Sequence, residues 1–344
     1  MKPLNQLLRA NIKDLKPYSS ARDEYTGEAA VFLDANENPF NQPYNRYPDP
    51  YQRKVKKKIS ELKAVDTSKI FLGNGSDEPI DLLFRAFCEP GVDNVVSIDP
   101  TYGMYQVAAD INNVEVRKVL LTNDFELDVD ALLSGCDGNT KLLFICSPNN
   151  PTGNCFKQED IETILKQFEG IVVLDEAYID FAPDKSLLSQ LDKYPNLVIL
   201  QTFSKAWGMA GIRLGMAFAS EEIIKVLSNI KYPYNINILT QEKALDLLER
   251  VDNKRSWVEQ LLNERKLMQD ALSGLSFVQK VYPSDANYLL VKVDDPKAIY
   301  NYLVEKKIII RDRSSVALCE GCLRITIGQP SENKLLLEEL DSFI

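Results

Sequence analysis

"IVVLDEAYI", residues 171–179, is a short apolar run that leads into a carboxylate, and runs of this kind decide the fold. Helical patterns such as "KQEDIETILKQF", residues 157–168, alternate with them. Short, mainly apolar strands separated by helices are typical of a parallel sheet covered by helices. The chain is therefore predicted to be α/β, with a mostly parallel sheet that contains the runs "NVVSI" (94–98), "VEVRKVLL" (114–121), "KLLFIC" (141–146), "IVVLDEAYI" (171–179) and "NLVIL" (196–200).

The chain of 344 residues is long enough for two domains. Residues 241–272 form a long amphipathic pattern without glycine or proline, as a helix that links two domains would. Short strand patterns follow it at 286–293, 307–312 and 322–328. We expect an N-terminal arm that is part of the small domain (1–40), a large domain (41–265) and a small C-terminal α+β domain (266–344).

Composition and the N-terminal sequence indicate a cytoplasmic protein. No apolar stretch approaches the ~18 residues of a membrane span, and the start, "MKPLNQLLRANIKDLKPYSS", is too polar for a signal peptide. The six cysteines are scattered, which favours reduced thiols over disulfides. Cys319 and Cys322 form a CxxC, but structural zinc usually needs four Cys or His ligands, so we expect no metal.

The sequence contains no histidine. This excludes Ser-His-Asp and Cys-His nucleophilic sites, so any proton must be carried by Lys, Tyr, Asp, Glu or Cys. The net charge of −10, without a basic run, gives no sign of nucleic acid or an anionic membrane as a partner. A small molecule is the favoured partner.

The run "GNGSDE", residues 73–78, opens directly into the helical pattern "PIDLLFRAF". Free backbone N–H groups and the positive end of a helix dipole then face outward together, which makes a seat for an anion. A turn followed by an ordinary Ser/Asp helix cap explains the same residues equally well. The run is not a P-loop, because no Gly-Lys-Ser/Thr follows.

The loop "CSPNNPTG", residues 146–153, follows a predicted strand at the edge where parallel sheets bind ligands. We expect Asn150 in this loop to contact a ligand, although an ordinary turn is the alternative.

Asp175 lies at the same edge of the predicted sheet, where a buried carboxylate is costly unless it is paired or hydrogen-bonded. A helix-capping or salt-bridged aspartate is the alternative for Asp175. Tyr178 offers a phenol in the same region.

The segment "QTFSKAWGMAGIRLG", residues 201–215, follows a further predicted strand. The pKa of a lysine in apolar surroundings falls by up to ~3 to 5 units, and its amine can then attack an aldehyde. The alternative is that Lys205 is an ordinary lysine on the surface. Thr202, Ser204 and Arg213 surround this lysine in sequence. Two hydroxyls and a guanidinium form a plausible phosphate clamp.

Together these groups match what pyridoxal 5'-phosphate needs, because it carries an aldehyde, a phosphate, a phenolic oxygen and a ring nitrogen that works best protonated. The chain resembles the fold-type I aminotransferases that use this cofactor, and within them the class II histidinol-phosphate aminotransferase family. The resemblance covers nearly the whole chain and implies a seven-stranded sheet in the large domain. The motifs that carry it are "NENP", "NRYPDPYQ", "GNGSDE", "PTYGMY", "SPNNPTG", "DEAY", "TFSKAWGMAGIRLG", "RD" at 311–312 and "GCLRITIG".

The resemblance implies a role for each residue of the set. Lys205 would bind the cofactor aldehyde covalently and then shuttle the proton, so no histidine is needed. Asp175 would pair with the ring nitrogen. Asn150 and Tyr178 would hydrogen-bond the phenolic oxygen, and Tyr102 would stack on the ring. The cofactor phosphate would be held by Gly75, Ser76, Asp77, Thr202, Ser204 and Arg213.

The resemblance also implies a homodimer, in which Tyr47 reaches the cofactor phosphate from the neighbouring subunit. Arg324 matches the arginine that binds a carboxylate in related aminotransferases. In this family Arg311 and Arg324 would bind the phosphate of histidinol phosphate, since two guanidinium forks suit a dianion. Arg324 would serve the carboxylate of glutamate or 2-oxoglutarate in the other half-reaction. Surface arginines at strand ends are the alternative.

We therefore predict reversible amino transfer between L-histidinol phosphate and 2-oxoglutarate, in histidine biosynthesis. Gln201 departs from the pattern, because relatives often carry a basic residue there, but the cofactor set is unchanged. An aromatic amino acid aminotransferase or a threonine-phosphate decarboxylase would share Lys205, Asp175 and Arg213. A cofactor-sensing regulator on the same fold would carry a DNA-binding segment, and the first 30 residues show no helix-turn-helix and no basic patch.

Overall fold

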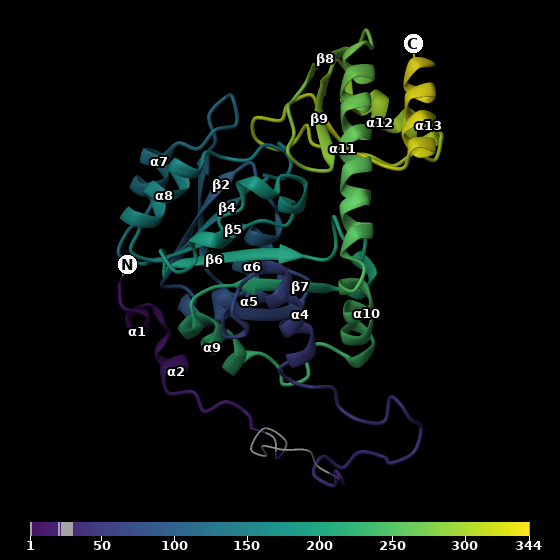
Figure 1. Ribbon diagram of the computed structural model, residues 1–344. Helices are drawn as coiled ribbons and strands as arrows, with labels where there is room; N and C mark the ends of the chain where they lie inside the picture. The colour runs from purple at the N-terminus through teal and green to yellow at the C-terminus, as the bar shows by residue number, and fades with distance from the viewer. Residues whose placement is uncertain (1, 20, 22–29, 344) are drawn as a thin grey trace.

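A seven-stranded sheet forms the larger layer of the computed structural model, which describes residues 2–19, 21 and 30–343. The strand order is β1-β7-β6-β5-β4-β2-β3. All neighbours from β6 to β3 are parallel, while β7 runs antiparallel to both β1 and β6 (Figure 1). The predicted α/β fold with a mostly parallel seven-stranded sheet is confirmed.

Helices cover both faces of this sheet. The strands are β1 (Ile70–Asn74), β2 (Asn94–Asp99), β3 (Glu115–Leu120), β4 (Thr140–Cys146), β5 (Ile171–Asp175), β6 (Leu197–Thr202) and β7 (Leu214–Phe218). One face carries α5 (Asp77–Phe87), α6 (Met104–Ile111) and α9 (Glu221–Ile230), and the other carries α4 (Arg53–Lys63), α7 (Val129–Ser134), α8 (Gln158–Gln167) and α10 (Ile238–Leu248). Short 3₁₀ turns lie at Thr67–Lys69, Ile179–Phe181, Pro183–Lys185, Leu188–Gln190 and Ala210–Ile212.

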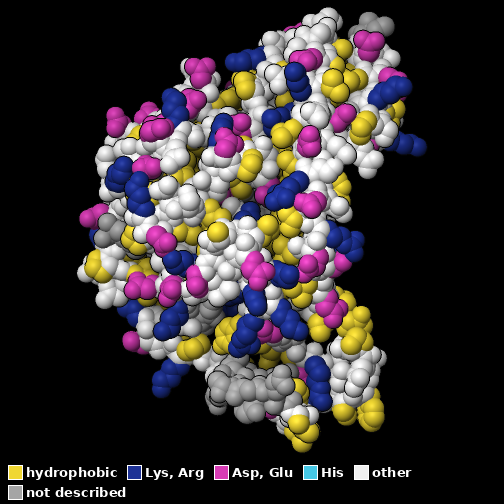
Figure 2. Space-filling model, in the orientation of Figure 1, with side chains coloured by type: hydrophobic (Ala, Val, Ile, Leu, Met, Phe, Trp, Pro, Cys, Tyr) yellow, Lys and Arg dark blue, Asp and Glu magenta, His cyan; other side chains and the backbone are white. Residues whose placement is uncertain are grey.

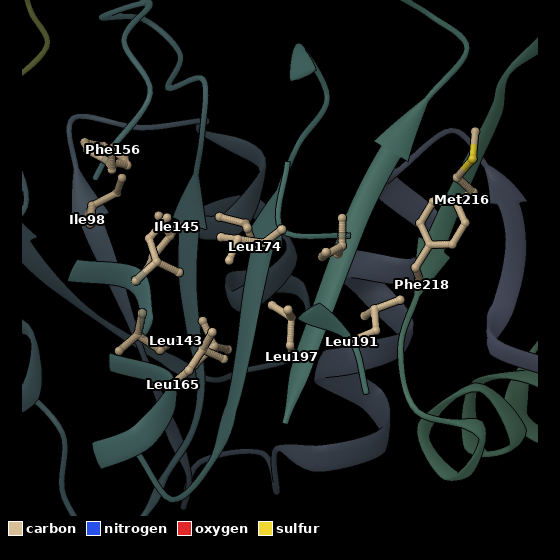
Figure 3. Close-up of a cluster of buried hydrophobic side chains, with 14 of the residues drawn as sticks. Ile98, Leu143, Ile145, Phe156, Leu165, Leu174, Leu191, Leu197, Met216 and Phe218 are labelled. Atoms are coloured by element: carbon tan, nitrogen blue, oxygen red, sulfur yellow. The ribbon is translucent and has the colours of Figure 1, made fainter. Parts of the chain in front are cut away.

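Side chains of each central strand alternate between two apolar cores. Leu143 and Ile145 of β4 point into the core drawn in Figure 3, whereas Phe144 belongs to the core on the opposite face. All five residues of β5 are buried for this reason. Full burial of each such side chain stabilises the fold by roughly 1.5–3 kcal/mol. The sheet is therefore a rigid platform for whatever extends from the carboxyl ends of its strands.

A smaller antiparallel sheet lies beyond the large layer, in the order β10-β11-β9-β8. Its strands are β8 (Val278–Val281), β9 (Tyr288–Val293), β10 (Arg311–Asp312) and β11 (Cys322–Thr326). One face packs under α11 (Val251–Ser273), α12 (Pro296–Glu305) and α13 (Pro330–Asp341). The other face turns to the large layer, because Leu290 and Cys322 belong to the core cluster of that layer.

Helix α11 connects the two layers as one continuous element, seen in Figure 1 as the long green helix between α10 and the small sheet. A linking helix was predicted here. The expected boundary between residues 265 and 266 falls inside it. The division into domains 41–265 and 266–344 stays a prediction.

The start of the N-terminal arm packs against the large layer, through α1 (Leu4–Leu7) and the segment before α2 (Ala10–Lys13). Leu7 is buried in the core beneath α5, and the backbone N–H of Arg9 donates to the carbonyl of Ala86 at 3.0 Å. The expectation that the arm is part of the small domain is therefore wrong for these residues, because burial of Leu7 fixes them elsewhere. Residues 1, 20 and 22–29 of the arm, and residue 344, lie outside the described residues.

Within residues 2–19, 21 and 30–343, no helix combines the length and the apolar character needed to cross a membrane. In the same ranges, no three Cys, Asp or Glu side chains gather where they could bind a metal ion. Cys319 and Cys322 are both free thiols and both buried in the apolar core.

Candidate active site

A cavity of about 140 Å³ lies at the carboxyl edge of the large sheet, where β4, β5 and β6 end. Parallel strands bring segments that are distant in sequence to one edge, which is where such sheets bind ligands. The predicted residues that line the cavity are Ser76, Asp77, Tyr102, Asn150, Asp175, Tyr178, Thr202, Ser204, Lys205 and Arg213. Cys146, Ala177 and Ala210 also line it and were not predicted.

The predicted anion seat is built where two backbone segments cross. Gly75 has a φ of 67°, and a Cβ on Gly215 would lie 2.2 Å from the carbonyl carbon of Gly75, so this crossing requires glycine at both positions. Ser76 is the N-cap of α5. The backbone N–H groups in the first turn of α5 have no acceptor within the helix, and the guanidinium of Arg213 lies beside them.

Side chains from β6 and the turn after it complete the seat. Arg213 donates from Nη1 to Ser204 Oγ at 3.4 Å, and the hydroxyl of Thr202 donates to Ser204 Oγ at 3.1 Å. The carboxylate of Asp77 is engaged by Arg213 Nη2 at 3.4 Å and by the hydroxyl of Tyr102 at 3.1 Å. Asp77 can therefore offer an anion its backbone N–H while its own negative charge is compensated.

Asp175 ends β5 and is almost completely buried. It accepts a hydrogen bond from the hydroxyl of Tyr105 at 2.7 Å and another from the N–H of Ala177 at 3.0 Å. Burial raises the pKa of this carboxyl to about 6, although both hydrogen bonds and the charge of Lys205 oppose the rise. Tyr105 was not predicted to take part. Asp175 is suited to a cationic partner, which would relieve the cost of burying its charge.

Asn150 connects the large sheet to the small one. Its Oδ1 accepts a hydrogen bond from Arg324 Nη1, and its Nδ2 donates to the hydroxyl of Tyr178 at 3.4 Å. A guanidinium can only donate, so the contact with Arg324 fixes the amide oxygen on that side and turns the NH₂ group toward Tyr178. The buried phenol and the amide together present two donors to a ligand oxygen.

Lys205 lines the cavity from the turn that follows β6, and its Nζ lies 5.3 Å from the centre of the Tyr178 ring. The side chain as a whole is exposed where the cavity opens, although protein atoms pack around the amine. Burial lowers the pKa of this ammonium, and the charges of Arg324 and Arg213 lower it further, against the opposing effect of Asp175. A larger share of the lysine is then the neutral, nucleophilic amine at neutral pH.

Four predicted residues are not among those that line the cavity: Gly75, Arg311, Arg324 and Tyr47. Gly75 lies directly behind the lining residue Arg213, since a Cβ added to this glycine would lie 2.5 Å from Arg213 Nη2. Arg311 lies on exposed β10, directly opposite Arg324 on β11. Tyr47 stacks on Tyr234 with ring centres 4.4 Å apart and is half-exposed. The proposed role of Tyr47 in a neighbouring subunit stays a prediction.

Gln201, the departure from the family pattern, points away from the anion seat. Its Nε2 donates to the buried carboxylate of Glu176 at 2.8 Å, and it lines a separate cavity beside Lys63. Burial raises the pKa of Glu176, while hydrogen bonds from Leu187 and Ser186 oppose this. Gln201 therefore lies outside the set of groups around Lys205.

These residues fit the cofactor predicted from the sequence. The two glycines leave room for an anion at the start of α5, and Arg213 supplies positive charge there. Asp175 is a buried carboxylate suited to a cationic ring nitrogen, and Lys205 is an amine with a lowered pKa in the same cavity. The set contains every type of group that a phosphorylated pyridine aldehyde requires.

Comparisons with known proteins found similar chains among the histidinol-phosphate aminotransferases. A curated histidinol-phosphate aminotransferase of Parabacteroides distasonis is 60% identical over 99% of each chain. The crystal structure of the histidinol-phosphate aminotransferase from Clostridium acetobutylicum superposes with a TM-score of 0.81 at 26% identity, over 87% of this chain and 90% of that one. The structure from Sinorhizobium meliloti, in complex with pyridoxal-5'-phosphate, has a TM-score of 0.80 at 21% identity, over 99% and 96%, and so shows a shared fold.

A family model described as "Aminotransferase class I and II" matches residues 24–340, nearly the whole chain. The resemblance predicted from the sequence is confirmed by this match and by the relative at 60% identity. The chain belongs to the class I and II aminotransferase family and, within it, to the histidinol-phosphate aminotransferases.

Proposed function

We propose that this protein uses pyridoxal 5'-phosphate to transfer an amino group between L-histidinol phosphate and 2-oxoglutarate. The observation that carries the proposal is the meeting of Lys205, Asp175 and Arg213 around one cavity. Arg324, tied to this cavity through Asn150, adds a cation for the substrate. The relative at 60% identity supports the choice of substrate. A cytoplasmic location stays a prediction from the sequence.

The reaction needs a nucleophilic amine and a mobile proton at one place, and Lys205 can provide both. When bound, the cofactor supplies an aldehyde that takes up the amine and a ring that withdraws electrons from the carbon losing its proton. Lys205 would bind the aldehyde, and its amine, once displaced by substrate, would carry the proton between the two reacting carbons. Its lowered pKa suits both tasks, because it increases the share of the free base.

The other cavity residues orient the ring and keep its charge in place. Asp175 would hold a negative charge beside the ring nitrogen, and Tyr105 fixes the carboxylate by its hydrogen bond. Asn150 and Tyr178, which are hydrogen-bonded to each other, would donate to the phenolic oxygen. Tyr102, held by Asp77, offers its ring as a stacking surface.

Arg311 and Arg324 suit the phosphate of the substrate. They lie opposite each other on β10 and β11, on the sheet face that turns toward the cavity. Each guanidinium presents a planar fork of N–H donors that matches a phosphate. In the other half-reaction Arg324 is free to take the carboxylate of glutamate or 2-oxoglutarate.

The substrate is tested by comparing L-histidinol phosphate, phenylalanine and phosphothreonine as amino donors to 2-oxoglutarate. We expect kcat/KM for histidinol phosphate to exceed that for phenylalanine by at least ~100-fold, because a site built to bind a charged group rejects a substrate that lacks it. Formation of glutamate measures amino transfer, and release of carbon dioxide from phosphothreonine reports decarboxylation. A preference for phenylalanine, or decarboxylation as the main reaction, contradicts the proposal.

We also propose a homodimer in which the arm around Tyr47 covers the neighbouring subunit. The described part of the arm exposes several large apolar side chains, among them Leu33 at 91% and Phe40 at 76%. The arm extends along the lower edge of the molecule, where yellow side chains gather in Figure 2. Exposed apolar side chains grouped in this way favour a protein partner, and a second copy of the chain is consistent with the family.

Tyr47→Phe should weaken cofactor binding several-fold, because one hydrogen bond to the phosphate is lost. Tyr44→Phe, a neighbouring change on the same arm, is the matched control. A mixture of Tyr47→Phe and Lys205→Ala chains should contain dimers with one intact site, since the Lys205→Ala chain lends its Tyr47 to the other subunit. Fluorescence titration with the cofactor should then reveal sites of wild-type affinity. Their absence after subunit exchange, or a monomer in sedimentation, contradicts the proposal.

A further inference from the structure

Arg313 is a third arginine beside the two that were predicted to bind substrate. The antiparallel ladder between β10 and β11 places Arg311 opposite Arg324, and it continues by one bond from the N–H of Arg313 to the carbonyl of Cys322 at 2.8 Å. Side chains alternate along a strand, so Arg313 points to the same face as Arg311. Cys322 on that face belongs to the core of the large layer. All three guanidinium groups therefore start from the face that turns toward the cavity.

Two of these guanidinium groups have donors without acceptors. The Nε atoms of Arg313 and Arg324 are buried, and neither has a hydrogen-bond partner. The carboxylate between the strand arginines, Asp312, accepts from the N–H and hydroxyl of Ser314 at 2.8 and 2.6 Å. Among the described residues, none pairs its charge with Arg311, Arg313 or Arg324.

The positive charges of Arg311, Arg313 and Arg324 lie close together, and an anionic ligand would compensate them. Burial lowers the pKa of the Arg313 guanidinium, and the nearby charges of Arg324 and Arg311 lower it further. Buried donors without partners cost stability, and so do clustered cations, unless an anion binds them. Two guanidinium forks already suit a dianion. A third is suited to a phosphate monoester, which carries up to two charges and three free oxygens.

We propose that Arg313 is a substrate-binding residue that acts with Arg311 and Arg324 on the phosphate group and makes the site selective for phosphate monoesters over carboxylates. This assignment rests on the proposed function, and it adds a residue that distinguishes the two half-reactions. The half-reaction with the phosphorylated amine depends on Arg313. The half-reaction with glutamate or 2-oxoglutarate, which carry carboxylates alone, does not.

The test compares Arg313→Gln and Arg313→Lys with the matched control Arg255→Gln, which removes one positive charge from an exposed part of α11. The two half-reactions are measured separately on the holoenzyme, by mixing it with histidinol phosphate or, in the aminated form, with 2-oxoglutarate. Arg313→Gln should lower kcat/KM for histidinol phosphate by roughly 10- to 100-fold, mainly through KM, since one charge-assisted contact is lost. The reaction with 2-oxoglutarate should change less than about threefold, and Arg313→Lys should restore part of the loss.

Calorimetric titration of each holoenzyme with inorganic phosphate gives a second measurement that does not depend on turnover. Weaker phosphate binding in Arg313→Gln, together with an unchanged response in Arg255→Gln, supports the assignment. Equal losses in both half-reactions, or unchanged phosphate binding, overturn it. If the wild-type enzyme binds phosphate through Arg313 but does not turn over histidinol phosphate, the phosphate site stands and the proposed function fails.

Discussion

Lys205→Ala is expected to lower turnover by at least about 10⁴-fold and to remove the visible absorbance of the lysine-bound cofactor. The magnitude follows because one side chain provides both the covalent anchor and the proton carrier, and proton transfer alone is typically worth 10²–10⁴-fold. The sequence has no histidine that could replace it. Asp175 is held by Tyr105 and Ala177, and the phenol of Tyr178 has a pKa that burial raises above its ordinary value, so neither is a ready substitute.

The covalent role is measured directly by treating the holoenzyme with borohydride and determining the mass of the intact chain. Wild-type protein should gain the mass of one reduced cofactor, and peptide mapping should place it on Lys205. Lys266→Ala, a change of an exposed lysine on α11, should behave as wild type. A cofactor-sized adduct that persists in Lys205→Ala would show that another lysine is the anchor.

The elements that could be predicted from the sequence are those with strong local signals. The apolar runs predicted β2 to β6, and the residues just beyond the carboxyl ends of β4, β5 and β6 were expected to meet at one edge. The structure brings ten of the predicted residues into one cavity. This succeeded because parallel strands all end at the same edge of the sheet, and β4, β5 and β6 are neighbours in it.

The residues that sequence reasoning missed depend on packing between distant segments. Tyr105 is part of "PTYGMY", but only the docking of α6 on the sheet directs its hydroxyl at Asp175. Arg313 follows the motif "RD" by one residue, and strand alternation from Arg311 could have identified it, had the ladder with β11 been known. Neither contact has a signal within a single run of sequence.

The positions of the N-terminal arm and of β7 also depend on packing between distant segments, which the sequence alone does not reveal. Leu7 packs under α5 because the large layer offers it an apolar site, and nothing near Leu7 in the sequence encodes that site. Strand β7 runs antiparallel between β1 and β6, while its first residues overlap the motif that contains Lys205. Its place in the sheet is a property of the whole layer, and short apolar runs do not determine strand order.

Asp175→Asn is expected to lower kcat by roughly 10²- to 10³-fold, which is the usual cost of losing one preorganised electrostatic contact. Asparagine keeps the size of the side chain but carries no charge, so it cannot hold a proton on the ring nitrogen. The cofactor should bind more weakly to this variant, and its phosphate contacts with Arg213 and Ser204 should remain. Stopped-flow measurement of a single half-reaction separates the chemical step from binding. A wild-type rate in that step contradicts the assigned role.

The same substitution should have the opposite effect on the cofactor-free protein. The pKa of Asp175 is raised from 3.8 to about 6, so the folded chain holds its proton more tightly than the unfolded chain does. This contribution favours folding most below pH 4 and is lost as the pH rises to about 6, above which the buried charge costs roughly 3 kcal/mol. Asp175→Asn removes this dependence. Relative to wild type, the cofactor-free variant should therefore gain stability as the pH rises from 4 to 7.

Denaturant unfolding of the two cofactor-free proteins across this pH range measures that difference, and groups that titrate identically in both cancel. Tyr105→Phe is the informative control, because it keeps the carboxyl but removes a hydrogen bond that lowers its pKa. The transition in stability should then move to higher pH. A difference between Asp175→Asn and wild type that stays constant from pH 4 to 7 would mean that Asp175 ionises normally in the folded chain. Burial of the ionised Asp175 carboxylate would then not destabilise the cofactor-free protein.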